Sequence, residues 1–203
     1  MKRLSFALVF ACIVMALGAQ TIKVKYQGSK PTIGDFAWAL LSDYDNNAQD
    51  TDESMAAMLQ AWKKYRKGQT LDQSDFILVD DKNGYAEFES TYDNQTLKIE
   101  MCFWNEADGK HKLVAVNVGC YTDGKYTPGQ YDGLNFYRYT NATKKMTMLD
   151  NAPGFTVQYG TSNGDPVSYT LPCNGKNITM TTWKRNGTTK QSTLKWNGSK
   201  FTK

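Results

Sequence analysis

The chain has 203 residues, of which 40% are hydrophobic, 13% aromatic and 22% charged, and its formal net charge is +4. This composition excludes a disordered chain and indicates a folded domain with a sizeable core. The small net charge argues against a nucleic-acid partner, which would call for a strongly basic surface.

Residues 1–19 have the pattern of a secretory signal peptide. Met1-Lys2-Arg3 is basic, Leu4–Leu17 is almost continuously apolar, and small residues lead into polar sequence after Ala19. The apolar run is shorter than the roughly 20 residues that a helix needs to cross a bilayer. We therefore expect residues 20–203 to form a single mature domain without a transmembrane segment, in the periplasm or outside the cell.

Removal of the signal peptide would change the charge and the cysteine content. Loss of Lys2 and Arg3 lowers the formal charge from +4 to +2, because the signal contains no acid. Val9-Phe10-Ala11-Cys12 is similar to a bacterial lipobox, in which the cysteine becomes a lipid anchor. The bulky Phe10 and the apolar run that continues past Cys12 favour a released protein over an anchored one.

The mature chain is predicted to begin with one strand and two helices. Ile22–Tyr26 alternates in polarity and predicts a short strand. Apolar residues three and four positions apart predict helices over residues 33–44 and 55–65. Basic residues at 63–67 favour the end of the second helix, where the helix dipole stabilises positive charge, and Gly68 can terminate it.

From Phe76 onward the period of the apolar pattern changes to two, which predicts strands. Asn83-Gly84 predicts a two-residue hairpin turn, with Val79 opposite Phe88 and Ile77 opposite Ser90. A second hairpin turns at residues 107–110, and a single register buries all of its apolar residues on one face. That register pairs Phe103 with Val114, Met101 with Val116, Ile99 with Val118 and Leu97 with Cys120.

Further strands are expected at residues 134–139, 145–149, 155–159, 167–171, 178–183 and 192–196. Strand following strand through short turns is typical of an antiparallel meander. The predicted fold class is α+β, with two N-terminal helices packed on a large antiparallel β-meander sheet.

The cysteines predict neither a metal site nor a full set of disulfides. Cleavage of the signal leaves Cys102, Cys120 and Cys173, an odd number. The hairpin register places Cys102 and Cys120 on opposite faces, so these two are not expected to pair, whereas Cys173 could meet either of them. Their spacing does not fit a zinc site, and no metal or other cofactor is expected.

The sequence contains no recognisable catalytic motif. His111 is the only histidine and is expected to form a surface pair with Glu106. A G-x-S-x-G motif and a glycine-rich nucleotide loop are both absent, so no catalytic residue is predicted and enzymatic activity stays open.

Acidic residues leave one enzymatic alternative. They are densest around the first hairpin, at Asp80, Asp81, Glu87 and Glu89. The hairpin is not a calcium loop, because Val79 and Ser90 occupy its first and last ligand positions. Carboxylates in such numbers could instead supply the two acids of a hydrolase.

Aromatic side chains are the remaining candidates for a ligand-binding site. The candidate residues are Trp104, Tyr121, Tyr137, Tyr139, Trp183 and Trp196. Rings on a sheet face either bind sugars or fill the second core of a β-sandwich, and both interpretations fit. The basic stretch 166–203, with seven Lys or Arg and no acid, suits either an anionic partner or protected strand edges.

The ends and the layout of the chain resemble a known group of proteins. The Met-Lys-Arg start, the Ala-Gln at the end of the signal, helices followed by a meander, and the closing residues 194–201 (LKWNGSKF) are similar to uncharacterised exported proteins of Bacteroidetes-type bacteria. This resemblance implies export but no activity. We expect a non-catalytic binding or interaction protein whose partner is a glycan or a cell-envelope protein, with a carbohydrate-binding module and a carboxylate hydrolase as alternatives.

Overall fold

The computed structural model describes residues 21–47, 53–128, 132–158 and 164–203. The predicted signal peptide, residues 1–19, and its Cys12 lie outside these ranges. The described residues form mostly antiparallel strands together with two helices, and the predicted α+β class is confirmed.

The elements, in chain order, are β1 (Thr21–Lys23), α2 (Ile33–Asn47), α3 (Glu53–Arg66), β2 (Asp75–Asp80), β3 (Tyr85–Tyr92), β4 (Gln95–Asn105), β5 (His111–Thr122), β6 (Lys125–Tyr126), β7 (Gly133–Thr140), β8 (Lys145–Met148), β9 (Val167–Thr170), β10 (Ile178–Trp183), β11 (Thr189–Trp196) and β12 (Phe201–Thr202).

The strands form two sheets, where the sequence predicted one large meander. The larger sheet has the order β1-β8-β7-β5-β4-β3-β2, with β6 paired to β5, and the smaller sheet has the order β12-β11-β10-β9. The chain leaves the larger sheet after β8, and residues 149–158 and 164–166 form no helix or strand before β9 begins. The strand expected at 155–159 is not formed at 155–158, because Phe155 turns into the core between the two sheets instead; residue 159 lies outside the described ranges.

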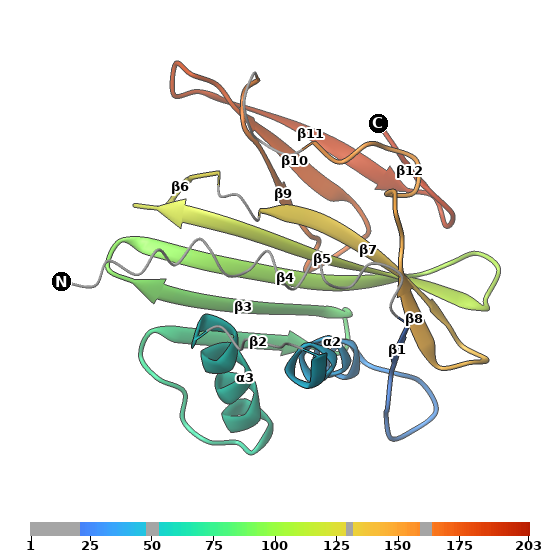
Figure 1. Ribbon diagram of the computed structural model, residues 1–203. Coiled ribbons are helices and arrows are strands. Elements are labelled where there is room, and N and C mark those ends of the chain that lie inside the picture. Colours follow the sequence, from blue (N-terminus) through green and yellow to red (C-terminus); the bar gives the residue numbers. More distant parts are fainter. Residues whose placement is uncertain (1–20, 48–52, 129–131, 159–163) are drawn as a thin grey trace.

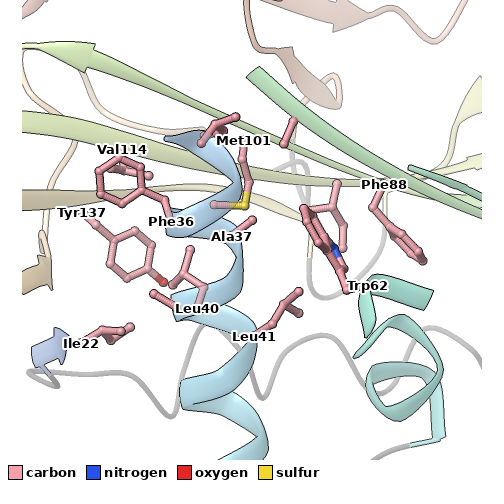
Figure 2. Packing of buried hydrophobic residues seen from close by; sticks show 14 of the residues in the cluster. Ile22, Phe36, Ala37, Leu40, Leu41, Trp62, Phe88, Met101, Val114 and Tyr137 are labelled. Carbon is pink, nitrogen blue, oxygen red and sulfur yellow. The ribbon is translucent and has the colours of Figure 1, made fainter. Parts of the chain in front are cut away.

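Helices α2 and α3 cover one face of the larger sheet (Figure 1). A capping box starts α2, since the Thr32 N–H donates to Asp35 Oδ2 at 2.8 Å and Thr32 Oγ1 faces the Asp35 N–H. Along α2, Phe36 and Leu40 face the sheet, and Trp62 of α3 lies near Phe88 (Figure 2). The helices predicted over residues 33–44 and 55–65 are confirmed as α2 and α3, and their apolar residues pack into this first core.

The smaller sheet lies over the opposite face of the larger one (Figure 1). The layer between the sheets is a second core built around aromatic rings: Phe201 is fully buried and lies 4.9 Å from the ring of Trp196 and 5.2 Å from that of Trp104. The Trp104 indole also donates to the Lys176 carbonyl at 3.0 Å. The molecule is thus a three-layer structure of helices, large sheet and small sheet.

The two predicted hairpin registers have different outcomes. The register of β4 and β5 is confirmed, including Ile99 opposite Val118. The register of β2 and β3 was wrong by two residues, because Ile77 faces Phe88 and Val79 faces Ala86. The turn is longer than a two-residue turn: the Asp80 carboxylate accepts the Asn83 N–H at 3.0 Å and holds a four-residue loop.

Candidate functional site between the two sheets

Four of the six candidate aromatic residues are core residues. Trp104 and Trp196 are buried in the second core, where their rings lie 6.0 Å apart, and Tyr137 and Tyr139 are buried under the helices. An exposed row of these rings on a sheet face is therefore not formed. The sequence left two interpretations for these rings, sugar binding or filling a second core. Trp104 and Trp196 fill the second core.

The other two candidates, Tyr121 and Trp183, are half-buried and come close together through Tyr126. The ring centroid of Tyr126 lies 5.8 Å from that of Tyr121 and 6.0 Å from that of Trp183. Strand β6 folds back on β5 through Asp123 and Gly124, which both adopt positive φ (50° and 72°). Three strands of two sheets thus supply one group of rings.

One face of the β4–β5 hairpin explains why the rings gather at this end. From one end to the other, the cross-strand pairs on this face are Trp104–Leu113, Cys102–Ala115, Glu100–Asn117, Lys98–Gly119 and Thr96–Tyr121. The face is therefore apolar where the small sheet packs tightly and becomes polar toward Tyr121. The layer between the sheets opens where the polar pairs begin.

A hollow of about 280 Å³, including space open to solvent, lies at this opening. Its lining residues are Asn117, Val118, Gly119, Tyr121, Tyr126, Asp132, Gly133, Gln158, Val167, Ser168 and Tyr169. The ring of Tyr121 lies beside Gly119, 3.4 Å from where a Cβ of residue 119 would stand. Trp183 is not one of the lining residues but contacts two of them: its indole N–H donates to Ser168 Oγ at 2.9 Å, and its ring lies beside that of Tyr126.

The hollow is rich in hydroxyl groups that stay protonated. Burial and the nearby Glu100 charge raise the pKa of Tyr121 to about 12. Burial, followed by the charge of Asp132, also raises the pKa of Tyr126, whose hydroxyl is hydrogen-bonded to Asp132. At neutral pH the site therefore presents two tyrosine hydroxyls beside one carboxylate.

A buried polar network lies next to the hollow and joins the two sheets. Glu100 is only 2% exposed, and its Oε2 accepts from the Asn117 amide at 2.9 Å and from the Leu171 N–H at 3.3 Å. Asn117 also donates to the Tyr169 carbonyl at 2.8 Å. These bonds tie β4 and β5 to β9 and to the segment that follows it, so the network holds the small sheet in place.

Glu100 belongs to a carboxylate pair within this network. The Tyr85 hydroxyl contacts Glu87 and lies 3.1 Å from Glu100 Oε1, and Lys98 pairs with Glu87 at 2.8 Å. Burial raises the pKa of Glu100, although Asn117 and Lys98 oppose the shift. The two acids are close enough for general acid–base chemistry, but the oxygens of Glu100 are occupied by three donors.

His111 lies at the distal end of the β4–β5 hairpin and pairs with a different acid from the expected one. Its Nδ1 lies 2.5 Å from Asp108 Oδ2, whereas Glu106 binds Arg138 at 2.8 Å. Asp108 also accepts the N–H groups of Lys110 and His111; the His111 side chain and these bonds lower the pKa of Asp108 to about 2. Ligand atoms of Glu106, Asp108 and His111 lie within 4.8 Å of one another, but Asp108 and His111 are bonded to each other and Glu106 is bonded to Arg138 of β7.

The three described cysteines are free, and the prediction that Cys102 and Cys120 do not pair is confirmed. Cys102 is buried in the second core, and burial raises its thiol pKa. Cys120 was expected to be a buried apolar residue; it is half-buried instead and hydrogen-bonds Asp132, and its pKa rises to about 12, mainly through burial. Cys173 packs at the border of the second core.

Part of the hollow was predicted from the sequence. Tyr121 and Trp183 were among the candidates, and Tyr126 could have been added because it follows Tyr121 across an Asp-Gly turn. Gln158 and Ser168 carry no signal in the sequence, since they enter the hollow only through the placement of the small sheet.

Neither helix within the described ranges is long and apolar enough to span a membrane. Comparison of the chain with models of known protein families, with curated proteins and with solved structures finds no match. The assignment of function therefore depends on the geometry of the site.

Proposed function

We propose that this chain is a non-catalytic binding protein that acts outside the cytoplasm, and that the hollow is its ligand site. The observation that carries the proposal is the meeting of Tyr121, Tyr126 and Trp183 at an opening lined by hydroxyl, amide and carboxylate groups. Concave sites that combine a few aromatic rings with convergent polar groups are typical of small-molecule binding. Action outside the cytoplasm rests on the signal-peptide pattern of residues 1–19.

The chemistry of the hollow fits a neutral, hydroxyl-rich ligand such as one sugar unit at the end of a glycan. The aromatic rings offer flat apolar surfaces with polar edges, and Asp132 can accept hydrogen bonds from ligand hydroxyls. Acidic sugars would meet the negative charge of Asp132, which lines the hollow. The hollow encloses little space and is largely open to solvent, so it suits contact with one sugar unit at a chain end better than with a long stretch of glycan.

Hydrolysis by the carboxylate pair is the weaker candidate. A retaining glycosidase keeps its two carboxyl groups about 5 Å apart and open to the substrate. Glu87 and Glu100 share the Tyr85 hydroxyl, but Glu100 is almost completely buried and accepts the Leu171 N–H and the Asn117 amide. A substrate could reach Glu100 only if the small sheet moved away.

Isothermal titration calorimetry on the full chain tests the proposal. The ligands are neutral and acidic monosaccharides and short oligosaccharides. We expect at least one neutral sugar to bind and Trp183→Ala to weaken that binding about tenfold or more, a loss of about 1.4 kcal/mol. Tyr126→Phe should weaken it less, because only one hydroxyl is lost.

Trp38→Ala is the matched control, since Trp38 is also a half-buried tryptophan but stacks under Arg66 on the helical side. It should bind the sugar like the unchanged chain. Failure of every neutral sugar to bind, or equal binding by Trp183→Ala, would contradict the proposal. Release of a hydrolysis product that depends on Glu87 would favour the enzymatic candidate instead.

A further inference from the structure

The edges of the two sheets are protected to very different degrees. Among the described strands, β1 has three residues including Lys23, β12 has two, and β9 has four between Pro166 and Pro172. Short length, lysine and proline are the usual means of preventing edge-to-edge association. β2 ends the larger sheet with six residues, DFILVD, and has neither lysine nor proline.

The backbone of β2 presents hydrogen-bonding groups to this open edge. The Thr91 N–H donates to the Ser74 carbonyl at 3.0 Å, so the bonded pairs with β3 fall at even-numbered residues of β2. Because N–H and C=O directions alternate along a strand, Ile77 and Val79 direct theirs away from β3. No other strand among the described residues pairs with this side.

The side chains of β2 add an apolar strip beside these groups. Phe76 is 48% exposed and Leu78 is 38% exposed, and both lie on the face opposite the helices. Among the described residues, the only other large hydrophobic side chain this exposed is Tyr65 of α3. An apolar edge with unpaired backbone groups is a template for a further strand.

We propose that β2 pairs in antiparallel fashion with β2 of a second copy of this chain, about a two-fold axis at Ile77. In this register Ile77 faces its own copy and Val79 faces Asp75. The N–H and C=O groups of Ile77 meet those of its copy, and the Val79 N–H meets the Asp75 carbonyl, while the Asp75 N–H stays bonded to the Asp72 carbonyl at 3.0 Å. Phe76 then lies opposite Leu78 of the other copy on both sides of the axis. The two larger sheets become one continuous sheet with its exposed apolar strip covered.

The acidic residues near β2 are compatible with this register. Asp80 lies opposite Ser74 of the other copy, so no acid directly faces another, which would be destabilising. The carboxylates are also partnered within each chain: Asp75 accepts from Ser90 at 3.0 Å, and Asp80 caps the turn through Asn83. Glu87 and Glu89 of the neighbouring strand share Lys98.

Light scattering on the full chain over a wide range of concentration tests the proposal. The apparent mass should double as concentration rises, and Leu78→Lys should keep it at the monomer value at the same concentrations. Val79→Pro should act in the same way, because it removes an N–H that faces the partner and leaves the bonds to β3 intact.

Thr170→Lys is the matched control, since Thr170 is an exposed residue of the edge strand β9 in the other sheet; this variant should still dimerise. Hydrogen exchange gives an independent measurement: the amides of Ile77 and Val79 should gain protection with concentration. A monomer at every concentration, or a dimer that survives both β2 substitutions, would overturn the proposal.

Discussion

The two faces of the larger sheet are covered in physically different ways. On the helical side the core is formed by aliphatic and aromatic side chains from α2, α3 and seven strands, β1–β5, β7 and β8, among them Phe36 and Val114 (Figure 2). On the other side the small sheet rests on a ring cluster around Phe201 at one end and on hydrogen bonds to Glu100 and Asn117 at the other.

This difference suggests separate roles for the two layers. A core built mainly of apolar side chains gains its stability mostly from burial and tolerates little opening to water. A layer that becomes polar along its length can end in a solvent-facing hollow without exposing a large apolar surface. The helical layer therefore supports the fold, and the small sheet shapes the hollow between Tyr121 and Trp183.

The largest expected effect comes from removing one central ring on each side. Phe36 and Phe201 are both fully buried, and a Phe→Ala change in a core costs about 3–5 kcal/mol. We expect Phe36→Ala to lower the protection of the whole larger sheet against hydrogen exchange. Phe201→Ala should release β9–β12 first, because side chains and a few hydrogen bonds attach the small sheet.

Hydrogen exchange resolved by residue measures this difference. If Phe201→Ala raised exchange equally in β2–β8 and in β9–β12, the two layers would form one cooperative unit and the proposed separation would fail. Phe36→Ala serves as the control for loss of a ring of equal size.

How far the fold could be predicted depended on the range of the interactions. The β4–β5 register was predicted because every apolar residue on both strands had to share one face, with Ile99 opposite Val118. The β2–β3 register was missed by two residues because the side-chain cap of Asp80, and not the Asn-Gly pair alone, sets the loop length. An error of two residues keeps each residue on its face, so the apolar pattern could not reveal it.

The site was less predictable than the fold for the same reason. Trp104 and Tyr121 lie on the same face of one hairpin, and alternation alone cannot distinguish their surroundings. Trp104 is buried because the small sheet covers it, and Tyr121 is half-exposed because that cover has become polar and opens. The position of the small sheet depends on contacts more than 50 residues apart, such as Asn117 with Tyr169.

A smaller effect is expected from adding one methyl group at a glycine in each layer. Gly154 has a φ of +88°, and a Cβ there would lie 2.3 Å from the Phe201 carbonyl oxygen, which is backbone and cannot rotate away. Gly84 has a φ of +69°, and its Cβ would lie 2.9 Å from the ring of Phe103, a side chain that can shift. Gly154→Ala should therefore cost about 3 kcal/mol and Gly84→Ala about 1–2 kcal/mol.

Chemical denaturation of both variants measures the two free energies of unfolding. Equal losses would mean that the segment around Gly154 can move relative to β12, and the attachment of the small sheet would be looser than the structure indicates. Gly187→Ala is a useful reference, because its φ of +83° is similar and no atom lies within 4 Å of the added Cβ.

The smallest expected effect is a change in pH dependence, and it tests the polar end of the small sheet. Because burial raises the pKa of Glu100 in the folded chain, the folded state holds this proton to a higher pH than the unfolded state does. Between the ordinary and the raised pKa the contribution of Glu100 to stability therefore falls as pH rises. Glu100→Gln removes this pH-dependent contribution: the Gln oxygen can accept from Asn117 and Leu171, while its NH₂ can donate to the Tyr85 hydroxyl.

Thermal unfolding from mildly acidic to neutral pH measures the effect. The stability of Glu100→Gln relative to the unchanged chain should increase as pH rises. Glu89→Gln, nearer the surface beside Lys98, should show no such increase. A difference between Glu100→Gln and the unchanged chain that does not vary with pH would mean that Glu100 is solvated in solution, and that the layer between the sheets opens further than the hollow beside Tyr121.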